Sequence, residues 1–318
     1  MIETFKRDVE RGLGANPKFL SSKYFYDKKG DELFVKIMHL PEYYLTRSEF
    51  EIFKKKSDDL IDGFDLDNQI PFELIELGAG DGTKTKELLK ELLKQDYDFT
   101  YKPIDISKHA LEQLEGSLKE SFPELKVEKQ VGEYFEVLTD LKNSGKKKVI
   151  LFLGSNIGNL TDEQSSRFLK ELSEVMNDGD ILLLGVDLIK KQEIVLPAYD
   201  DASGVTAAFN LNLLERINRE LGANFNLDQF VHEAVYTEEE GIAKSYLKSM
   251  ESQEVYIRAL DRTFIFAKGE RIHMEISRKY NDRILERIME GTSLEVRDKI
   301  MDDRAYFADY ILVFQDRA

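Results

Sequence analysis

The sequence predicts an α/β protein built on a doubly wound parallel sheet, and two observations lead to this fold class. Short runs rich in leucine and β-branched residues alternate with amphipathic stretches through the middle of the chain. Each run is apolar at successive positions and is bounded by polar or glycine-rich turns, which is typical of strands buried on both faces of a parallel sheet. Strands joined through helices require right-handed crossovers, and these give a doubly wound sheet.

The elements follow in order along the chain. Residues before position 70 are expected to be mostly helical, with helices at 30–38 and 48–60 separated by an aromatic loop at 41–44. The expected strands of the sheet are 72–77, 100–104, 125–131, 148–153 and 180–186. The expected helices between them are 84–94, 108–120 and 162–176. The last helix begins with Thr161-Asp162-Glu163-Gln164, a capping-box pattern, and should stop at Asn177-Asp178-Gly179.

The second half of the chain breaks this alternation. A helix is expected at 206–221, followed by strands at 254–260, 263–266 and 271–278 that would form an antiparallel meander. A final strand is expected at 306–314. We therefore predict a sheet domain of residues 62–187 plus 271–318. Residues 1–61 plus 188–270 would form an inserted α+β cap domain that binds the substrate.

Composition excludes several classes of protein. The 318 residues carry 45 Lys and Arg against 61 Asp and Glu, a net charge of −16, and no basic stripe that would attract nucleic acid. The absence of cysteine excludes disulfides, thiolate metal sites and cysteine nucleophiles. The four histidines lack metal-ligand spacing, so no metal is expected. Without a signal peptide or a membrane-length apolar run, a cytoplasmic monomer with no membrane partner is expected.

The glycine loop after the first predicted strand is the sharpest local signal, with the sequence Glu76-Leu77-Gly78-Ala79-Gly80-Asp81-Gly82. Glycines allow positive φ and let a ligand approach the backbone, although such a loop can also simply turn the chain. A nicotinamide-binding loop would place a third glycine at position 83, which is Thr83. Asp105 ends the next strand, where a carboxylate can bind both ribose hydroxyls. Lys84 would pair with a ligand carboxylate, or else be an exposed first-turn lysine.

A second polar loop follows the fourth predicted strand, with the sequence Gly154-Ser155-Asn156-Ile157-Gly158-Asn159. Ligands of open α/β sheets bind at the carboxyl ends of strands, where this loop must lie. Asn159 offers a donor and an acceptor suited to an amino-acid amine and carboxylate. Its alternative role is a helix cap before Thr161. Ser155 does not lie in a nucleophile elbow, so hydrolase chemistry gains no support.

Long motifs then connect the chain to a known family. It resembles the histidine-specific methyltransferases of the ergothioneine pathway, which are similar to fungal enzymes that methylate a tryptophan derivative. The resemblance runs nearly end to end. The segments that carry it are Lys23-Tyr24-Phe25-Tyr26-Asp27, Leu40-Pro41-Glu42-Tyr43-Tyr44, residues 76–82, residues 152–160 and residues 198–209, which begin Ala198-Tyr199-Asp200-Asp201-Ala202-Ser203-Gly204.

The resemblance implies a Rossmann-like class I methyltransferase that uses S-adenosylmethionine. It implies that the cofactor is bound by Gly78, Gly80, Lys84, Asp105, Glu133 and Tyr134. It implies that the substrate is bound by Tyr43, Gly154, Asn159, Tyr199 and Ser245, with Tyr26 and Asn159 as the catalytic residues. It further implies that Glu275 and Ser277, two residues apart on one strand, bind the imidazole ring.

Three positions depart from the family pattern. Gly132-Glu133-Tyr134 stands where the family usually has Gly-Asp-Phe, and Glu133 can still accept from an adenine amino group. Ser245 replaces a methionine of the mycobacterial-type enzymes, and the segment before Tyr306 lacks the usual tryptophan. The last two changes concern the substrate rather than the cofactor.

The expected activity is therefore S-adenosylmethionine-dependent Nα-methylation of L-histidine up to the trimethylated betaine. A methyltransferase of the same fold acting on another amino acid or amine is the first alternative. A catalytically silent nucleotide-binding sensor protein is the second.

Overall fold

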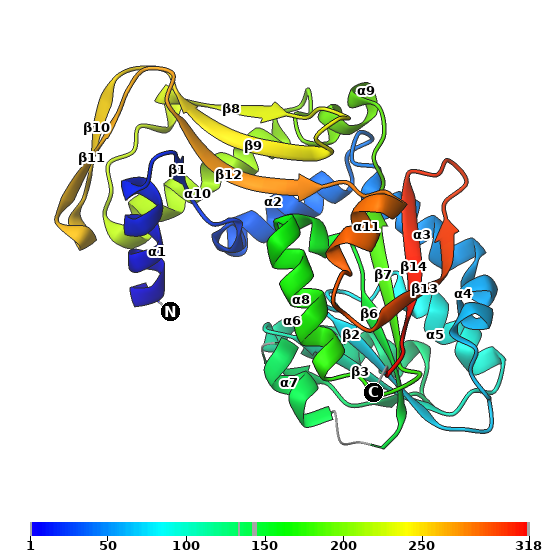
Figure 1. The fold of residues 1–318 in the computed structure, drawn as a ribbon. Helices are drawn as coiled ribbons and strands as arrows, with labels where there is room; N and C mark the ends of the chain where they lie inside the picture. Colours follow the sequence, from blue (N-terminus) through cyan, green and yellow to red (C-terminus); the bar gives the residue numbers. More distant parts are fainter. Residues whose placement is uncertain (1, 133, 142–144, 317–318) are drawn as a thin grey trace. The chain divides into compact units, whose positions relative to one another are not determined.

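The computed structural model describes residues 2–132, 134–141 and 145–316 (Figure 1). The chain divides into two compact units. Unit 1 comprises Met1–Tyr44 and Lys190–Arg278, and unit 2 comprises Leu45–Ile189 and Lys279–Ala318. Each unit contains its own sheet and its own hydrophobic core.

Unit 2 is built on an eight-stranded sheet with the order β13-β14-β7-β6-β2-β3-β4, in which β5 also pairs with β3. The strands are β2 (Phe72–Leu77), β3 (Phe99–Asp105), β4 (Lys126–Val127), β5 (Gln130–Val131), β6 (Lys147–Phe152), β7 (Ile181–Asp187), β13 (Leu294–Met301) and β14 (Phe307–Phe314). The pairs from β4 to β7 are parallel, whereas β14 and β13 are antiparallel. The predicted doubly wound parallel sheet is confirmed. The strand expected at 125–131 is two short strands, β4 and β5.

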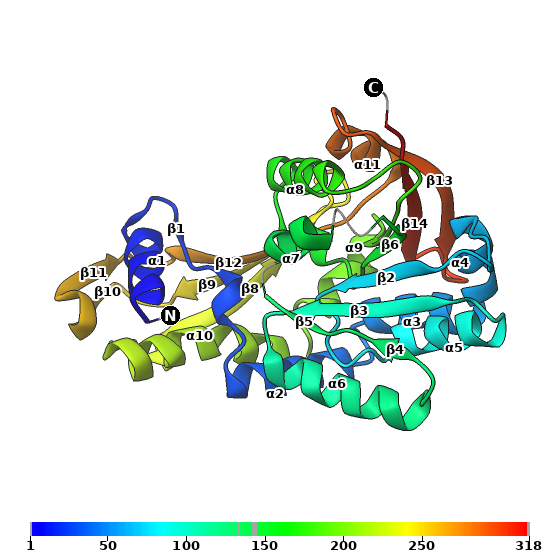
Figure 2. The same ribbon diagram turned by 90° about the horizontal axis from the view of Figure 1, so that it is seen from below.

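Helices cover both faces of this sheet. Successive side chains of a strand point to opposite faces, and every residue of β2 and β7 is buried, so both faces need cover. Leu74 packs in one core cluster and Ile75 in the other. The first cluster joins α3 (Leu45–Lys55), α4 (Ser57–Phe64), α5 (Thr85–Lys94) and α6 (Lys108–Ser121). The second joins α7 (Tyr134–Leu141), α8 (Asp162–Glu174) and α11 (Asp282–Ile288). Figure 2 shows these two groups of helices on opposite sides of the strands.

The helix expected at 48–60 is two helices, α3 and α4, which meet at Lys56. Lys56 leaves the helical conformation, with φ −131° and ψ 25°. The hydroxyl of Ser57 donates a hydrogen bond to the carbonyl of Phe53. A local bond of this kind competes with the regular helical ladder, and the chain changes direction there while both helices bury an apolar stripe.

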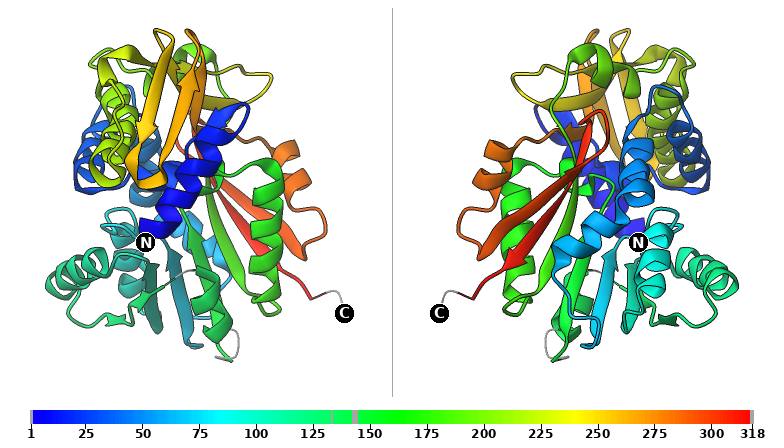
Figure 3. Two further views of the ribbon diagram at one scale, coloured as in Figure 1. Left: turned by 90° about the vertical axis from the view of Figure 1, so that its left-hand side faces the viewer. Right: turned by 90° about the vertical axis from the view of Figure 1, so that its right-hand side faces the viewer.

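Unit 1 contains a four-stranded sheet and a separate hairpin. The sheet has the order β1-β12-β9-β8, with β1 (Lys18–Phe19), β8 (Phe230–Val235), β9 (Ile242–Ser249) and β12 (Arg271–Arg278). The hairpin pairs β10 (Gln253–Ile257) with β11 (Arg262–Phe266). The helices are α1 (Ile2–Gly14), α2 (Lys28–Met38), α9 (Gln192–Val195) and α10 (Val205–Leu221). The helix predicted at 206–221 is confirmed, and the same elements can be followed from both sides in Figure 3.

The predicted meander is wrong, because β12 does not pair with β11. It pairs antiparallel with β9. The turn between β11 and β12 explains the difference, because Gly269, with φ +83°, donates its N–H to the carbonyl of Ser249 at 2.8 Å. Ser249 in turn donates its N–H to the carbonyl of Glu270 at 2.9 Å. The turn is thus anchored to the end of β9 and aligns β12 with that strand.

Besides residues 188–189, which belong to unit 2, two segments fall in a different unit from the one expected. Residues 45–61 were expected in the cap but form α3 and most of α4, which contact β14 and β13 in unit 2. Residues 271–278 were expected with the large sheet but form β12 of unit 1. Both differences arise from packing partners that lie far away in sequence.

Candidate functional site

The strand order of unit 2 has a switch point beside β2. β3 pairs with one edge of β2 and β6 pairs with the other. Ligands of open α/β sheets bind outside the carboxyl ends of strands at such a point. Both loops singled out in the sequence follow these strands, the glycine loop after β2 and the loop at 154–159 after β6. The topology therefore supports the place predicted for the ligand.

The glycine loop has the backbone conformation expected of it. Gly78, Gly80 and Gly82 have φ values of +73°, +54° and +65°. A Cβ added at Gly78 would lie 2.7 Å from the hydroxyl of Tyr134, whereas one at Gly80 would meet nothing within 4 Å. Gly78 is thus held in close contact with Tyr134, and Gly80 leaves the open space that a ligand needs.

Lys84 is not the exposed first-turn lysine of the alternative interpretation. Its ammonium pairs with the carboxylate of Glu49 on α3, and its side chain is 22% exposed. Burial opposes the charge, but the carboxylate of Glu49 raises the pKa of Lys84 above its ordinary value. Lys84 is therefore a fixed cation at the carboxyl end of β2.

The loop after β6 brings two more donors to the same place. Gly154 has φ +75°, and a Cβ added there would lie 3.6 Å from both Lys84 Nζ and Asn156 Nδ2. The N–H of Gly154 donates to Glu49 Oε1 at 2.7 Å. The ammonium of Lys84 and the amide N–H₂ of Asn156 thus lie close together beside the exposed Gly154. These donors can bind a carboxylate of a ligand.

Asn159 ends the short 3₁₀ helix Asn156–Asn159 and is exposed. The alternative interpretation of Asn159 as a helix cap is wrong, because Thr161 caps α8. The Thr161 hydroxyl accepts from the N–H of Gln164, and the Gln164 side chain accepts from the N–H of Thr161 at 2.9 Å. The predicted capping box is thus confirmed.

Asp105 ends β3 at the same edge of the sheet. Its Oδ1 accepts the N–H of Ser107 at 2.8 Å, which orients the carboxylate. Such a carboxylate at a strand end can bind a ribose diol. Glu133, expected beside it at the adenine, lies outside the described residues.

Glu76 lies directly beneath the glycine loop and is 3% exposed. Its carboxyl group accepts from the hydroxyl of Thr85 at 2.7 Å and from the hydroxyl of Tyr101. Burial raises the pKa of Glu76 to about 7, although both hydroxyls oppose the shift. The acid that precedes the glycines therefore connects β2 to the start of α5 and to β3.

The residues of unit 2 suit a ligand that joins a nucleoside to an amino acid. Asp105 can bind the ribose, and Lys84 with Asn156 can bind the amino-acid carboxylate. Gly78 and Gly80 allow the ligand to approach the backbone. This is the chemical form of S-adenosylmethionine, so the donor set fits the predicted cofactor.

Unit 1 gathers the other predicted residues on its four-stranded sheet. Ser245 on β9 is directly opposite Glu275 on β12. The register shifts between His273 and Glu275, where β12 contains a bulge. Directly opposed residues point to the same face, and Ser277, two residues further along, shares that face. Glu275, Ser277 and Ser245 thus form one polar patch on β9 and β12.

Tyr199 joins this patch from the segment before α10. Its hydroxyl donates to Ser277 Oγ at 2.8 Å, and its carbonyl oxygen lies 2.8 Å from His232 Nε2. Tyr199 and Ser277 are 8% and 6% exposed. Both backbone and side chain of Tyr199 are therefore fixed against the sheet of unit 1.

Tyr26 and Tyr43 are the remaining predicted site residues of unit 1. The ring of Tyr26 packs edge-on against Phe34 and Phe209, with centroid distances of 5.5 Å and 5.7 Å. Tyr43 packs edge-on against Phe34 at 6.4 Å. Tyr26 is 44% exposed, but desolvation of its hydroxyl by the surrounding protein, the nearby carboxylate of Glu275 and the hydroxyl of Tyr43 raise its pKa. Tyr26 is therefore a neutral phenol close to Glu275.

The predicted site residues form two groups, one in each unit. In unit 2 the structure places the described cofactor residues Gly78, Gly80, Lys84, Asp105 and Tyr134 and the substrate residues Gly154 and Asn159. In unit 1 it brings together Tyr26, Tyr43, Tyr199, Ser245, Glu275 and Ser277.

Two residues at the unit 2 site were not predicted from the sequence. Asn156 belongs to the polar loop, where Asn159 was preferred. Glu49 is an acid in the otherwise largely apolar buried stripe of α3, whose buried residues are Leu45, Ser48, Glu49, Ile52 and Phe53. A charged residue at such a position is the signal that could have identified it.

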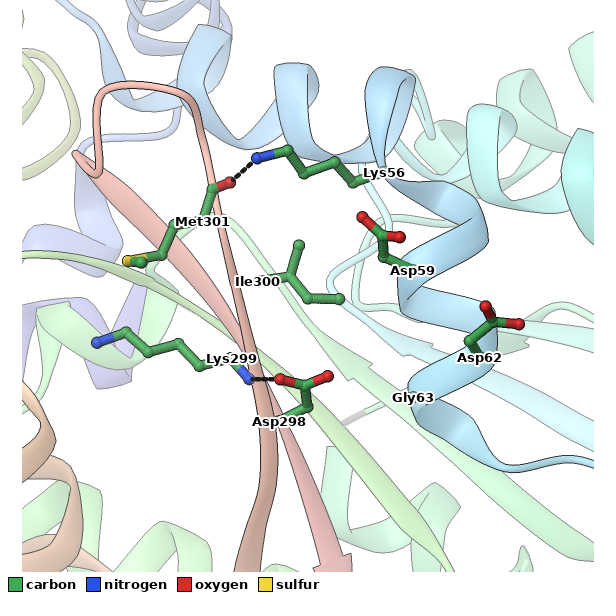
Figure 4. Close-up of a pocket in the computed structure, with 8 residues that line it drawn as sticks. All are labelled: Lys56, Asp59, Asp62, Gly63, Asp298, Lys299, Ile300 and Met301. Atoms are coloured by element: carbon green, nitrogen blue, oxygen red, sulfur yellow. Dashed lines mark hydrogen bonds between the residues drawn. The ribbon is translucent and has the colours of Figure 1, made fainter.

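A hollow of about 510 Å³ also lies on unit 2, between α4 and β13 (Figure 4). It is lined by the charged side chains of Lys56, Asp59, Asp62, Asp298 and Lys299, and also by Gly63, Ile300 and Met301. Lys56 Nζ donates a hydrogen bond to the carbonyl of Met301 at 2.6 Å. None of the predicted site residues lines it, so it supplies no part of the site described above.

Two further properties bear on the class of protein. Within the described ranges, no helix is both long enough and apolar enough to cross a membrane. Among the same residues, no group of three or more His, Asp or Glu side chains could hold a metal ion.

Comparison with known proteins assigns the family. The family described as "Histidine-specific methyltransferase, SAM-dependent" matches residues 5–314. A histidine N-alpha-methyltransferase of Mycolicibacterium smegmatis is 39% identical over 278 residues, covering 87% of this chain and 85% of that protein. One of Mycobacterium tuberculosis is 39% identical over 86% of this chain and 84% of that protein. Ergothioneine biosynthesis protein 1 of Schizosaccharomyces pombe is 30% identical over 93% of this chain and 39% of its own length. The chain therefore belongs to the S-adenosylmethionine-dependent, histidine-specific methyltransferase family.

Proposed function

We propose that this enzyme methylates the α-nitrogen of L-histidine and repeats the transfer until the trimethylated betaine is formed. The observation that carries the proposal is the pair Glu275 and Ser277 on one face of β12, with Ser245 opposite Glu275. An imidazole has two ring nitrogens, one a donor and one an acceptor. A carboxylate and a hydroxyl two residues apart on one strand can bind both. An indole has one ring nitrogen, a donor, and suits the pair less well.

The unit 2 residues would hold the cofactor. Lys84 and Asn156 would bind its amino-acid carboxylate, Asp105 its ribose, and Gly78 and Gly80 would allow its approach to the backbone. S-adenosylmethionine supplies the electrophilic methyl carbon when bound. The roles that the resemblance gives Gly154, Asn159, Glu133 and Tyr134 stay predictions.

The unit 1 residues would orient the amino acid. Nucleophilic attack needs an uncharged amine, whose lone pair forms the new N–C bond while the S–C bonding pair leaves with sulfur. Alignment of two reactants can lower a barrier by about 7 kcal/mol or more. Tyr26, Tyr43 and Tyr199 are suited to that task because each is fixed by ring packing or by a hydrogen bond.

Tyr26 is assigned to orientation and not to proton removal. Its pKa is raised by partial desolvation of the hydroxyl and by Glu275, so its hydroxyl stays protonated at neutral pH. A neutral phenol is a very weak base but can donate or accept a hydrogen bond. We therefore propose that water accepts the amine proton.

The test is mass spectrometry of free amino acids after incubation with the enzyme and S-adenosylmethionine. We expect histidine to gain up to three methyl groups at its α-nitrogen, and the other amino acids to react much more slowly. A clear preference for another amine would overturn the substrate assignment. Cofactor binding with no turnover on any amine would favour a sensor protein.

A further inference from the structure

Glu49 is a buried acid with two partners on different loops. It lies on α3 and is 1% exposed. A carboxylate buried among apolar side chains is costly unless it is paired and hydrogen-bonded. Glu49 meets both conditions, because one oxygen pairs with Lys84 and the other accepts the N–H of Gly154 at 2.7 Å.

These two partners belong to the loops that follow β2 and β6. Lys84 stands between the glycine loop and α5, and Gly154 opens the polar loop after β6. β2 and β6 are neighbouring parallel strands. One carboxylate on a helix outside the sheet thus connects the two loops on either side of the switch point.

The large sheet leaves room for this carboxylate at Gly185. A Cβ added at Gly185 would lie 2.3 Å from Glu49 Oε1, 3.0 Å from Asp309 Oδ1 and 3.2 Å from Phe307 Cε1. Glycine in the interior of a strand is destabilising and often marks a close approach by another group. Gly185 lies in the buried interior of β7, where the absence of a side chain makes space for the carboxyl groups of Glu49 and Asp309.

Asp309 is the second of these carboxyl groups. It is 0% exposed, and neither of its oxygens has a hydrogen-bond partner among the described residues. Burial and the neighbouring charge of Glu49 raise the pKa of Asp309 well above its ordinary value. Of the two carboxyl groups, Glu49 is therefore the one that is hydrogen-bonded to Lys84.

We propose that Glu49 is a positioning residue for the methyl donor. By binding Lys84 and Gly154 at once, it fixes the ammonium and the loop after β6 in one arrangement that receives the amino-acid carboxylate of S-adenosylmethionine. The ammonium has three N–H donors, so its bond to Glu49 leaves others for the ligand. Donors that are already fixed bind a ligand with a smaller loss of conformational entropy. The inference rests on the proposed function for the identity of the ligand.

The main test is the affinity of the enzyme for S-adenosylmethionine, measured by isothermal titration calorimetry. Glu49→Gln keeps the shape of the side chain but removes its charge. We expect it to weaken cofactor binding by about 10- to 100-fold, as for loss of a charge-assisted hydrogen bond. Glu51→Gln is the matched control, because Glu51 lies on the same helix and pairs with Lys55 instead. The control should bind the cofactor as the wild type does.

A double variant separates positioning from a general structural role. Because Glu49 acts through both Lys84 and Gly154, Glu49→Gln with Lys84→Met should bind the cofactor more weakly than Lys84→Met alone, but by less than the sum of the two single losses. Additive losses would contradict the proposal. Cofactor binding by Glu49→Gln within twofold of the wild type would overturn it. Tighter binding would overturn it as well, because Glu49 would then compete with the ligand for Lys84.

Two further variants keep the test valid if Glu49→Gln does not fold. Gly185→Ala moves the carboxylate without removing its charge, and we expect a smaller loss of affinity. Glu49→Asp retains the charge on a shorter side chain, so its cofactor affinity should fall below that of the wild type but stay above that of Lys84→Met. Thermal unfolding of each variant reports whether the fold is kept.

The assay also separates this inference from the proposed substrate. Histidine methylation by the wild type tests the substrate, and cofactor affinity of the Glu49 variants tests Glu49. Weak cofactor binding by Glu49→Gln, in an enzyme that does not methylate histidine, would support the positioning role and reject the substrate.

Discussion

Ser245 lies directly opposite Glu275, at the place where the bulge in β12 shifts the register of its pairing with β9. Directly opposed side chains in an antiparallel pair have their Cβ atoms about 5 Å apart. A small hydroxyl side chain at position 245 therefore leaves space beside the Glu275 carboxylate. Together with Ser277, this pair forms the polar patch that we propose binds the imidazole ring.

The first prediction concerns Glu275. Glu275→Ala should lower kcat/KM for histidine by about 100-fold, because a buried ring nitrogen would lose its charged partner. The affinity for S-adenosylmethionine, measured by calorimetry, should change by less than twofold. Glu254→Ala, on the exposed side of the hairpin, is the control and should retain full activity. Equal losses of histidine turnover and cofactor affinity would show that Glu275 is structural.

The second prediction compares two glycines of one loop. Both have positive φ, but only Gly78 would place a Cβ against Tyr134, at 2.7 Å from its hydroxyl. Gly78→Ala should therefore weaken cofactor binding by at least about tenfold, from backbone strain together with the clash. Gly80→Ala would instead place its Cβ in the space left for the ligand, so it should also weaken cofactor binding, but Tyr134→Phe should not restore that affinity. Adding Tyr134→Phe to Gly78→Ala should recover part of the lost affinity, and no recovery would argue against the clash.

The third prediction separates two neighbouring residues by function. Thr161→Ala removes the cap of α8 and should cost about 1 kcal/mol of stability, lowering Tm by about 2–4 °C. Its kcat/KM should stay unchanged. Asn159→Ala should leave Tm unchanged, because Asn159 does not cap the helix, and should lower kcat/KM for histidine by about tenfold or more. The opposite assignment of the two effects would reject the role proposed for Asn159.

The fourth prediction follows from the buried acid Glu76. Its pKa of about 7 in the folded protein exceeds its ordinary value of 4.5, so the folded state binds more protons between these values. The free energy of unfolding must then fall as pH rises through this window. Relative to Glu76→Gln, the wild type should lose about 2–3 kcal/mol between pH 4.5 and pH 8. Urea unfolding at several pH values measures the difference, and parallel curves for the two proteins would contradict it.

The periodicity of the sequence predicted the large sheet well, because its parallel strands are buried on both faces. Runs such as 72–77 and 180–186 are apolar at successive positions, and few other structures accommodate them. The edge strand β13 was not predicted. Its residues Val296, Arg297 and Asp298 are exposed, so it lacks an alternating apolar pattern and is held by its pairing with β14.

The glycine loop, Asp105 and the residues of the polar loop could be placed from the sequence because their chemistry is local. A strand end, a positive φ and a helix start lie within a few residues of one another. Long motifs then identified the family. In unit 1 the spacing of Glu275 and Ser277 was enough to place both on one face, because side chains alternate along a strand.

Only the tertiary structure showed which distant side chains contact the residues of the glycine loop and the polar loop. Glu49 reaches Lys84 and Gly154 across more than thirty and more than a hundred positions of the sequence, and Gly185 and Asp309 join it from other strands. The sequence alone determined the fold class, the family and the loops, because these depend on local periodicity and on motifs. The division of the chain between units and the surroundings of Glu49 depend on packing between distant segments, which no local pattern records.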